Sequence, residues 1–593
     1  MVKTPLASPI FAAPKKDIFF RFYRYIQQFC GKKLILCIIS LTFLIVFCHR
    51  NKTSFKNPLR PETGLSISGL VRDSQGPVQG AVVRIQATTF FDTTDSQGQF
   101  VLKNLAANTS VTLTAWAAGY YITGGTDYLP GTDSVEFVLT KIHETDHSEY
   151  QWISGFSEAG GSGNCQVCHA STAGSNQNLP FDEWLQDAHS QSTKNIRFLT
   201  MYTGTDVYGN QSPATRFGYN RDYGSFPLPP NSEEPYYGPG YQLDFPATKG
   251  NCAACHAPAA AIDDPYGTDP THLEGVAAEG IGCDFCHKVW DVKLNPATGM
   301  PYDNMPGVLS YEFRRPPEGH QYFAGPYDDV APGEDTYTPI QTKSQYCAPC
   351  HFAKFWDVEI YNSFGEWLDS PYSDPETGQT CQDCHMPPGL TDHFAIKDKG
   401  GKSRDPKTIF SHRMPGAMDE NLLRNALTMT ANTSRNGEVI SVQVNLLNDK
   451  TGHHVPTDSP LRHLILLVEA TDASGDSLTQ ISGSTLPDWC GQGDPNQGYY
   501  AGLPGRAYAK ILEEFWTGVS PTGAYWNMTK IVSDNRIAAF DSDQSSYEFT
   551  SPANGSASVT VTLLFRRAYK QLSDWKSWDD PDIVMAEETY TLD

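Results

Sequence analysis

The feature that most constrains this chain is a five-residue pattern that occurs five times. Each copy has two cysteines three positions apart, and a histidine directly follows the second cysteine. The five copies account for ten of the fourteen cysteines. The copies are CQVCH (Cys165, Cys168, His169), CAACH (Cys252, Cys255, His256), CDFCH (Cys283, Cys286, His287), CAPCH (Cys347, Cys350, His351) and CQDCH (Cys381, Cys384, His385).

The spacing of the pattern indicates its chemistry. Residues three and four apart lie on one face of a helical turn. Two thiols at this spacing reach the two vinyl groups of one haem and form thioethers, while the adjacent histidine lies under the ring as an iron ligand. Each copy therefore predicts one covalent c-type haem, and the chain is predicted to hold five.

Three other uses of paired cysteines fit less well. Zinc needs four ligands at a site, normally two cysteine pairs, and gives no reason for a histidine after each of five pairs. A thioredoxin-like redox pair is a single copy within a β-α-β unit. Structural disulfides suit an exported protein, but not this uniform, tight spacing.

Each haem iron also needs a ligand on its distal side, and eleven of the sixteen histidines lie outside the motifs. Methionines 414 and 418 are weaker candidates, and Met386 is excluded because it directly follows the motif histidine His385. His463 lies in a strand-like run and is expected to face outward. The favoured distal ligands are His189, His272, His320, His412 and His453, with His143, His147, His393, His454 and His463 as secondary candidates.

An internal repeat sharpens this assignment. FDEWLQDAHS follows the first motif, and FGEWLDSPYS follows the fourth at nearly the same distance. Tyr372 stands in the second copy where His189 stands in the first. One haem must therefore find its distal ligand elsewhere or lack one, and His453 from the following domain is a candidate for that place.

The first 62 residues form a predicted targeting segment. Basic residues precede the apolar run Leu34–Cys48, which is expected to be helical, and this order is typical of an export signal. The run is short for a membrane span, which needs about 20 residues. No small-residue cleavage site follows it, so an uncleaved signal anchor is favoured over a cleaved signal peptide. Either way, the remainder of the chain is expected to leave the cytoplasm.

The flanks of the motif region alternate between apolar and polar residues, which predicts β-sandwiches. Gly64–Tyr121 resembles the carboxypeptidase regulatory-like domain, for which we expect only a spacer or docking role. Ala426–Asn448 predicts a hairpin that turns at Asn436-Gly437. The predicted fold is therefore multidomain: a targeting segment (1–62), a small antiparallel β-sandwich (63–142), a mainly α-helical and irregular pentahaem domain (143–425) and a C-terminal β-sandwich (426–593).

The motif region also resembles the multihaem c-type cytochromes, in particular the group related to the tetrahaem electron carrier of nitrifying bacteria. The matching phrases include HLEGVAAEGIGCDFCHKV, EWLDSPYSDPETGQTCQDCHMP, FSHRMPGA and TGHHVPTDSPLRHLILLVEATDASG. The resemblance implies an electron carrier whose haems pack in stacked and perpendicular pairs and whose irons are mostly held by two histidines. It implies the five favoured distal histidines without pairing them with haems. Five motifs, rather than four, are a departure from that group.

Electron transfer is the expected function, so a carrier is favoured over an enzyme. The alternatives are an oxidoreductase for a nitrogen or sulfur compound, with one open haem, and a subunit of an extracellular cytochrome filament. The formal net charge of −23 argues against a nucleic-acid partner. The expected partners are redox proteins and, through the N-terminal segment, a membrane. Homo-oligomers follow if the filament alternative holds, and the expected location is the periplasm or the cell surface.

Overall fold

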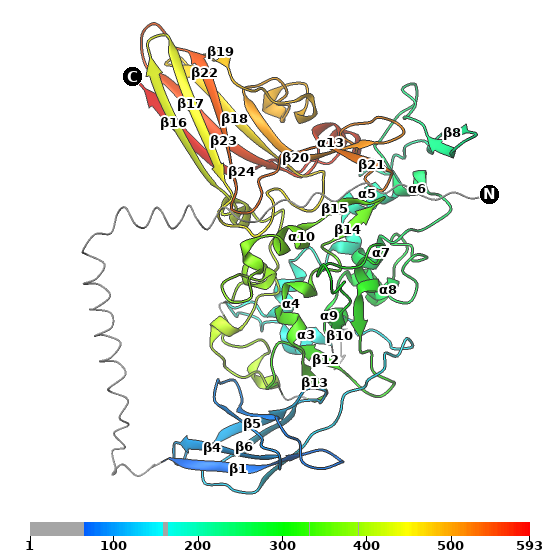
Figure 1. The fold of residues 1–593 in the computed structure, drawn as a ribbon, viewed down its shortest axis with the longest axis vertical. Helices are drawn as coiled ribbons and strands as arrows, with labels where there is room; N and C mark the ends of the chain where they lie inside the picture. Colours follow the sequence, from blue (N-terminus) through cyan, green and yellow to red (C-terminus); the bar gives the residue numbers. More distant parts are fainter. Residues whose placement is uncertain (1–63, 158–163, 331–332, 390) are drawn as a thin grey trace, which may run out of the picture. The chain divides into compact units, whose positions relative to one another are not determined.

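The computed structural model describes residues 64–157, 164–330, 333–389 and 391–593 (Figure 1). The predicted targeting segment, including Leu34–Cys48, lies outside these residues. In the part that is described, no helix combines the length and the apolar character needed to cross a membrane.

The N-terminal domain is a two-layer β-sandwich. β1 is the middle strand of one sheet, and β2 and β5 are the inner strands of the other. Both sheets bury their inward residues, among them Val71, Val83, Phe100 and Leu113. One strand pair departs from the expected antiparallel order, because β1 and β7 run parallel. The strands are β1 (Leu65–Arg72), β2 (Val82–Ile85), β3 (Phe91–Thr93), β4 (Gln99–Leu105), β5 (Val111–Trp116), β6 (Thr123–Tyr128) and β7 (Val135–Val138).

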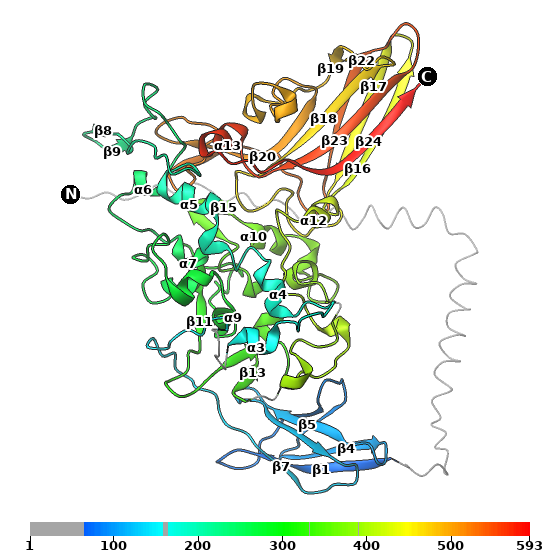
Figure 2. The same ribbon diagram turned by 180° about the vertical axis from the view of Figure 1, so that it is seen from behind.

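The central region consists of short helices joined by turns and small two-stranded sheets. α3, α4, α9 and α10 gather at its centre although they are far apart in the sequence (Figures 1 and 2). The helices are α3 (Cys165–His169), α4 (Pro180–Leu185), α5 (Ile196–Thr203), α6 (Tyr241–Asp244), α7 (Ala253–His256), α8 (Pro258–Ala261), α9 (Cys283–Cys286), α10 (Ser363–Leu368), α11 (Cys381–His385) and α12 (Glu420–Arg424).

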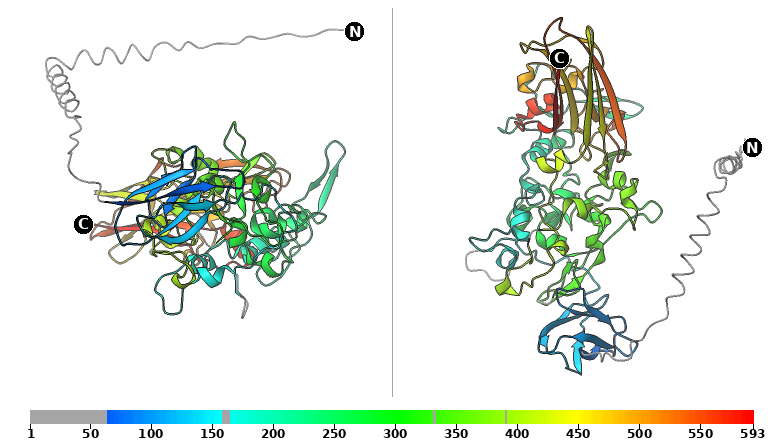
Figure 3. Two further views of the ribbon diagram at one scale, coloured as in Figure 1. Left: turned by 90° about the horizontal axis from the view of Figure 1, so that it is seen from below. Right: turned by 90° about the vertical axis from the view of Figure 1, so that its left-hand side faces the viewer.

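Four small sheets complete the central region. The hairpin of β8 and β9 reaches away from the neighbouring elements in both views of Figure 3 and carries exposed aromatic residues, including Tyr219 and Tyr223. The strands are β8 (Phe217–Asn220), β9 (Gly224–Pro227), β10 (Val289–Val292), β11 (Tyr311–Phe313), β12 (Phe323–Gly325), β13 (Asp335–Tyr337), β14 (Ala353–Phe355) and β15 (Val358–Tyr361).

The C-terminal domain is rich in β-sheet, with strand orders β16-β17-β22-β19 and β21-β20-β18-β23-β24. The predicted hairpin is formed by β16 and β17, and Gly437 at its turn has a φ of 61°. The elements are β16 (Thr428–Asn436), β17 (Val439–Leu447), β18 (His463–Asp472), β19 (Gln480–Ser482), β20 (Gly505–Glu514), β21 (Thr529–Asp534), β22 (Ser542–Thr550), β23 (Ala557–Arg566), α13 (Lys570–Lys576) and β24 (Ile583–Leu592).

β18 is covered on both of its faces. One face belongs to the core between the two sheets, and Ile465 and Leu467 on the other face pack against Leu486 and Cys490. His463, expected to face outward, is instead fully buried and stacks on Tyr569 with ring centres 5.6 Å apart. The alternation of residues in the strand could not reveal this second covering layer.

Candidate haem-binding cavity

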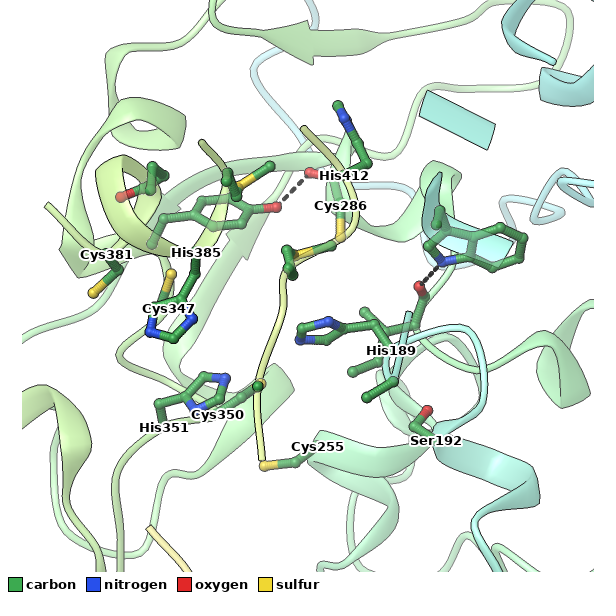
Figure 4. A pocket seen from close by; sticks show the side chains of 18 of the residues that line it. His189, Ser192, Cys255, Cys286, Cys347, Cys350, His351, Cys381, His385 and His412 are labelled. Carbon is green, nitrogen blue, oxygen red and sulfur yellow. Dashed lines mark hydrogen bonds between the residues drawn. The ribbon is translucent and has the colours of Figure 1, made fainter. Parts of the chain in front are cut away.

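One connected cavity of about 1750 Å³ runs through the central region, and all five motifs line it. This volume exceeds the roughly 300–1,000 Å³ of ordinary small-molecule pockets. Figure 4 shows cysteines and histidines of several motifs facing this space. The motif residues that line it are Cys165, Cys168, His169, Cys252, Cys255, His256, Cys283, Cys286, His287, Cys347, Cys350, His351, Cys381, Cys384 and His385.

The motifs adopt the helical turns that their spacing requires. Four of them coincide with α3, α7, α9 and α11. The fourth motif is not a regular helix, yet the N–H of His351 donates to the carbonyl of Cys347 at 3.1 Å, which is the helical i to i−4 bond. The two thiols and the imidazole of each motif are therefore held on one turn.

Four of the five motif imidazoles are oriented through Nδ1. When Nδ1–H donates to a carbonyl or carboxylate, Nε2 keeps its lone pair for a metal, which is the usual arrangement of a ligating histidine. With the paired thiols beside them, these donors fit haem c. The Nδ1 contacts are His169 to the carbonyl of Phe394 (2.8 Å), His287 to that of Ala324 (2.5 Å), His385 to that of Pro415 (2.7 Å) and His351 to the carboxylate of Asp458 (3.2 Å).

Burial and neighbouring charge set the protonation of these imidazoles. Burial lowers the pKa of His256 to about 4, so the ring is neutral at pH 7 and able to bind a metal. Burial also acts on His351, but the hydrogen bond and charge of Asp458 outweigh it and raise the pKa of His351 to about 9. His256 has a different neighbour: Phe198 stacks on its ring at 3.9 Å and 6°.

Two histidines outside the motifs stand at the spacing of a second iron ligand. The ring centres of His189 and His351 are 6.4 Å apart, and those of His453 and His385 are 6.3 Å apart. Two imidazoles on opposite sides of one iron have centres about 6 Å apart, because each metal–nitrogen bond is about 2 Å long and each ring centre lies about 1 Å behind its nitrogen. His189 follows the first motif in sequence, yet it faces the fourth (Figure 4).

A third non-motif histidine, His412, also lines the cavity. Its Nδ1 is buried and has no hydrogen-bond partner in the described chain. Burial, together with the charges of His287 and His169, lowers the pKa of His412 to about 4. A neutral imidazole with an unpartnered Nδ1 beside two motif histidines is suited to bind a metal held by either of them.

The remaining two favoured histidines lie elsewhere. His272 and His320 are absent from the cavity lining, and their side chains are 82% and 54% exposed. Nδ1 of His272 contacts the hydroxyl of Thr271, and Nδ1 of His320 contacts Glu334. His454, a secondary candidate in the sequence, does line the cavity. The only sequence signal for it was its position next to His453.

The two copies of the sequence repeat make matching hydrogen bonds in the structure. The indole N–H of Trp184 donates to the carbonyl of Ile281, two residues before Cys283. The indole N–H of Trp367 donates to the carbonyl of Gln379, two residues before Cys381. Both bonds are 2.8 Å long. Trp184 thus fixes the chain just before the third motif, and Trp367 fixes the chain just before the fifth motif.

The residues after each tryptophan repeat the same pattern. The carbonyl of His189 accepts from the N–H of Ile281 at 2.9 Å, and that of Tyr372 accepts from Gln379 at 3.0 Å. Glycine precedes each donor: a Cβ on Gly280 would lie 2.4 Å from the carbonyl oxygen of His189, so no larger residue fits there. Tyr372 is therefore the structural counterpart of His189, as the sequence predicted.

Thiols of different motifs meet inside the cavity. The thiol of Cys165 lies beside that of Cys283, and the thiol of Cys347 lies beside that of Cys381, so the first cysteines of the motifs are neighbours in the same way in both repeats. The neighbouring thiol of Cys283 lowers the pKa of Cys165. The thiol of Cys255 in the second motif lies beside that of Cys350 in the fourth. The first and third motifs form one pair, and the fourth and fifth form a similar pair. The second motif lies beside the fourth.

Comparisons with known proteins identify one domain by sequence. The sequence-family model of the carboxypeptidase regulatory-like domain matches residues 66–139, which confirms the predicted N-terminal sandwich. No curated protein matches the chain.

Among solved structures, a penta-heme cytochrome c552 from Thermochromatium tepidum is 19% identical, with a TM-score of 0.46. The match covers 70% of this chain and 96% of that one. A cohesin–X-dockerin complex from Acetivibrio cellulolyticus matches 13% of the chain and 58% of its own, at 20% identity and a TM-score of 0.12.

Proposed function

We propose that the cavity holds five covalently bound haem c groups and that the protein transfers electrons between redox partners. The observation that carries this proposal is the convergence of the motifs: ten thiols and five imidazoles from five separate segments line one cavity. Bound haem iron supplies reversible one-electron chemistry. The residues of the chain anchor each group, orient its ligands and exclude water from it.

The contacts between motifs favour a continuous route for electrons. The first and third motifs have neighbouring thiols, as do the fourth and fifth. The third and fourth motifs are joined through Tyr346, whose hydroxyl donates to the carbonyl of Cys286 at 2.9 Å. Groups held at these positions stand close enough for electrons to pass from motif to motif, and the second motif forms a branch at the fourth.

The location and partners are inferred from the sequence alone. Export through the N-terminal segment places the haem region outside the cytoplasm, in the periplasm or at the cell surface, with the apolar run Leu34–Cys48 as a membrane anchor. The net charge of −23 suits a redox partner with a basic docking face.

One observation favours a second function at the second motif. His256 is stacked against Phe198, whereas His351 and His385 each have a second histidine at ligand spacing. An iron without a second histidine is open to a small substrate, so the second candidate is an oxidoreductase that uses the second motif.

A redox titration of the holoprotein tests the proposal. Electron transfer predicts that five electrons per chain are taken up and returned reversibly, with a predominantly low-spin ferric spectrum. Irreversible uptake, or fewer than five electrons, contradicts it. A high-spin fraction that binds cyanide and turns over nitrite or sulfite would favour the second candidate.

A further inference from the structure

Three arginines from separate parts of the chain meet in the cavity lining. Arg197 lies in the first turn of α5, Arg462 directly precedes β18, and Arg567 directly follows β23. All three line the cavity and are mostly buried. Basic side chains are seldom buried without a partner for each charge, so their partners decide what they do.

The carboxylates near these arginines do not balance them. Asp580 pairs with both Arg197, at 2.7 Å, and Arg567, at 2.8 Å. The carboxylate nearest Arg462 is that of Asp458, at 4.0 Å, and it already contacts His351. Burial, followed by the charge of Arg567, lowers the pKa of Arg197 to about 10. The cluster therefore carries excess positive charge in a chain whose net charge is −23.

Most of the donors of the cluster are also free. A guanidinium has five N–H donors. In the described chain each arginine uses one: Arg197 and Arg567 donate to Asp580, and Arg462 donates to the carbonyl of Thr457. None of their nitrogens is among the buried polar atoms that lack a partner, so the unused donors face open space.

The cluster lies beside the second motif. Arg197 is adjacent to Phe198, whose ring stacks on His256. The guanidinium of Arg197 also lies 4.3 Å over the ring of Trp578, which fixes its plane. Planar, forked donors of this kind match the two oxygens of a carboxylate or an inorganic oxyanion.

We propose that Arg197, Arg462 and Arg567 form an anion-binding site at the second motif. The anion can come from two sources, and the inference rests on the proposed function for only one of them. The propionate carboxylates of the haem held by Cys252 and Cys255 are one source, and a free oxyanion from solution is the other.

Arg567→Gln in the holoprotein tests the site, and Arg566→Gln is the matched control. Arg566, the next residue, is more deeply buried than Arg567, pairs with Asp582 at 2.6 Å and does not line the cavity. If propionate is the ligand, Arg567→Gln lowers the reduction potential of one haem, because a nearby positive charge that favoured the reduced state is gone. Arg567→Lys preserves most of that potential, and the other four haems are unaffected.

If a free oxyanion is the ligand, inorganic phosphate binds the wild type saturably in calorimetry. Arg567→Gln then weakens that binding by about tenfold, the loss of one charge-assisted hydrogen bond. The site is refuted if Arg567→Gln and Arg566→Gln behave alike in both measurements. The haem content of each sample is measured in parallel. Wild type without haem refutes the proposed function and the propionate source, and the phosphate titration still decides whether the arginines bind an anion.

Discussion

The carboxylate of Glu366 accepts a hydrogen bond from the backbone N–H of His454 at 3.1 Å. Glu183, at the same position of the other repeat, accepts from the backbone N–H of His412 at 2.8 Å. Each repeat thus uses one glutamate to hold a segment that brings a non-motif histidine into the cavity. Glu366 is 3% exposed and also pairs with Arg536 at 2.7 Å.

Glu366 makes the stability of the fold depend on pH. Burial raises its pKa, but the ring of His454 and the charge of Arg536 outweigh burial and lower it to about 2. Because the folded value lies below the ordinary 4.5, the stabilisation is complete above pH 4.5 and is lost as the pH falls toward 2, by about 3 kcal/mol in all. Urea unfolding between pH 5 and 2.5 measures this loss.

The variant Glu366→Gln removes this titration. At pH 7 it loses about 3 kcal/mol, because a neutral amide replaces the carboxylate and Arg536 keeps only Asp534 as a charged partner. Its remaining stability then depends less on pH between 5 and 2.5. Glu420→Gln, at an exposed ion pair, changes stability by less than about 1 kcal/mol. A pH dependence in Glu366→Gln equal to that of the wild type would refute the assignment.

Four histidine variants test whether only the histidines that line the cavity serve as distal ligands. We expect His189→Ala and His453→Ala each to convert one of five haems from low spin to high spin, because these rings stand at ligand spacing from His351 and His385. His272→Ala and His320→Ala, outside the cavity, leave the ferric spectrum unchanged. Magnetic circular dichroism or electron paramagnetic resonance counts the change. High-spin haem in His272→Ala or His320→Ala would instead support the sequence-based assignment.

The repeated tryptophans should act on different haems. Trp184→Phe removes the donor to the carbonyl of Ile281, and Trp367→Phe removes the donor to that of Gln379. Each change costs about 1 kcal/mol of stability. Trp184→Phe also shifts the reduction potential of the haem at the third motif, and Trp367→Phe shifts that of the haem at the fifth motif. Trp575→Phe, in α13 and outside the cavity, shifts none. Equal potentials in all three variants would contradict the positioning role.

Lys576 ties the C-terminal domain to the central region. Its fully buried ammonium group donates to the carbonyls of Thr200 (2.9 Å), Thr205 (3.0 Å) and Pro239 (2.7 Å). Lys576→Met leaves these carbonyls without their donor and should lower the free energy of unfolding by about 2–4 kcal/mol. Lys570→Met, six residues earlier on the same helix, loses an ion pair with Asp574 and a cation–π contact with Tyr499, and should cost about 1 kcal/mol. Similar losses in both variants would argue against this tie.

The local features of this molecule were predictable from sequence. Cysteine spacing led to the motif turns, residue alternation led to the N-terminal sandwich, and the repeat placed Tyr372 opposite His189 in the alignment. Contacts between distant segments were not predictable. His189 faces the fourth motif although it follows the first, and Asp458 orients His351 from 107 residues away. His272 and His320 sit in sequence contexts like those of ligands, but only the path of the chain determines which histidines reach the cavity.

Mass spectrometry of the native protein, made in a host that matures c-type cytochromes, tests the central claim most directly. The account predicts a mass that exceeds the polypeptide by five haems, and tryptic peptides of all five motifs that carry haem on both cysteines. A native mass equal to that of the bare polypeptide, or one that accounts for fewer than five haems, would contradict it.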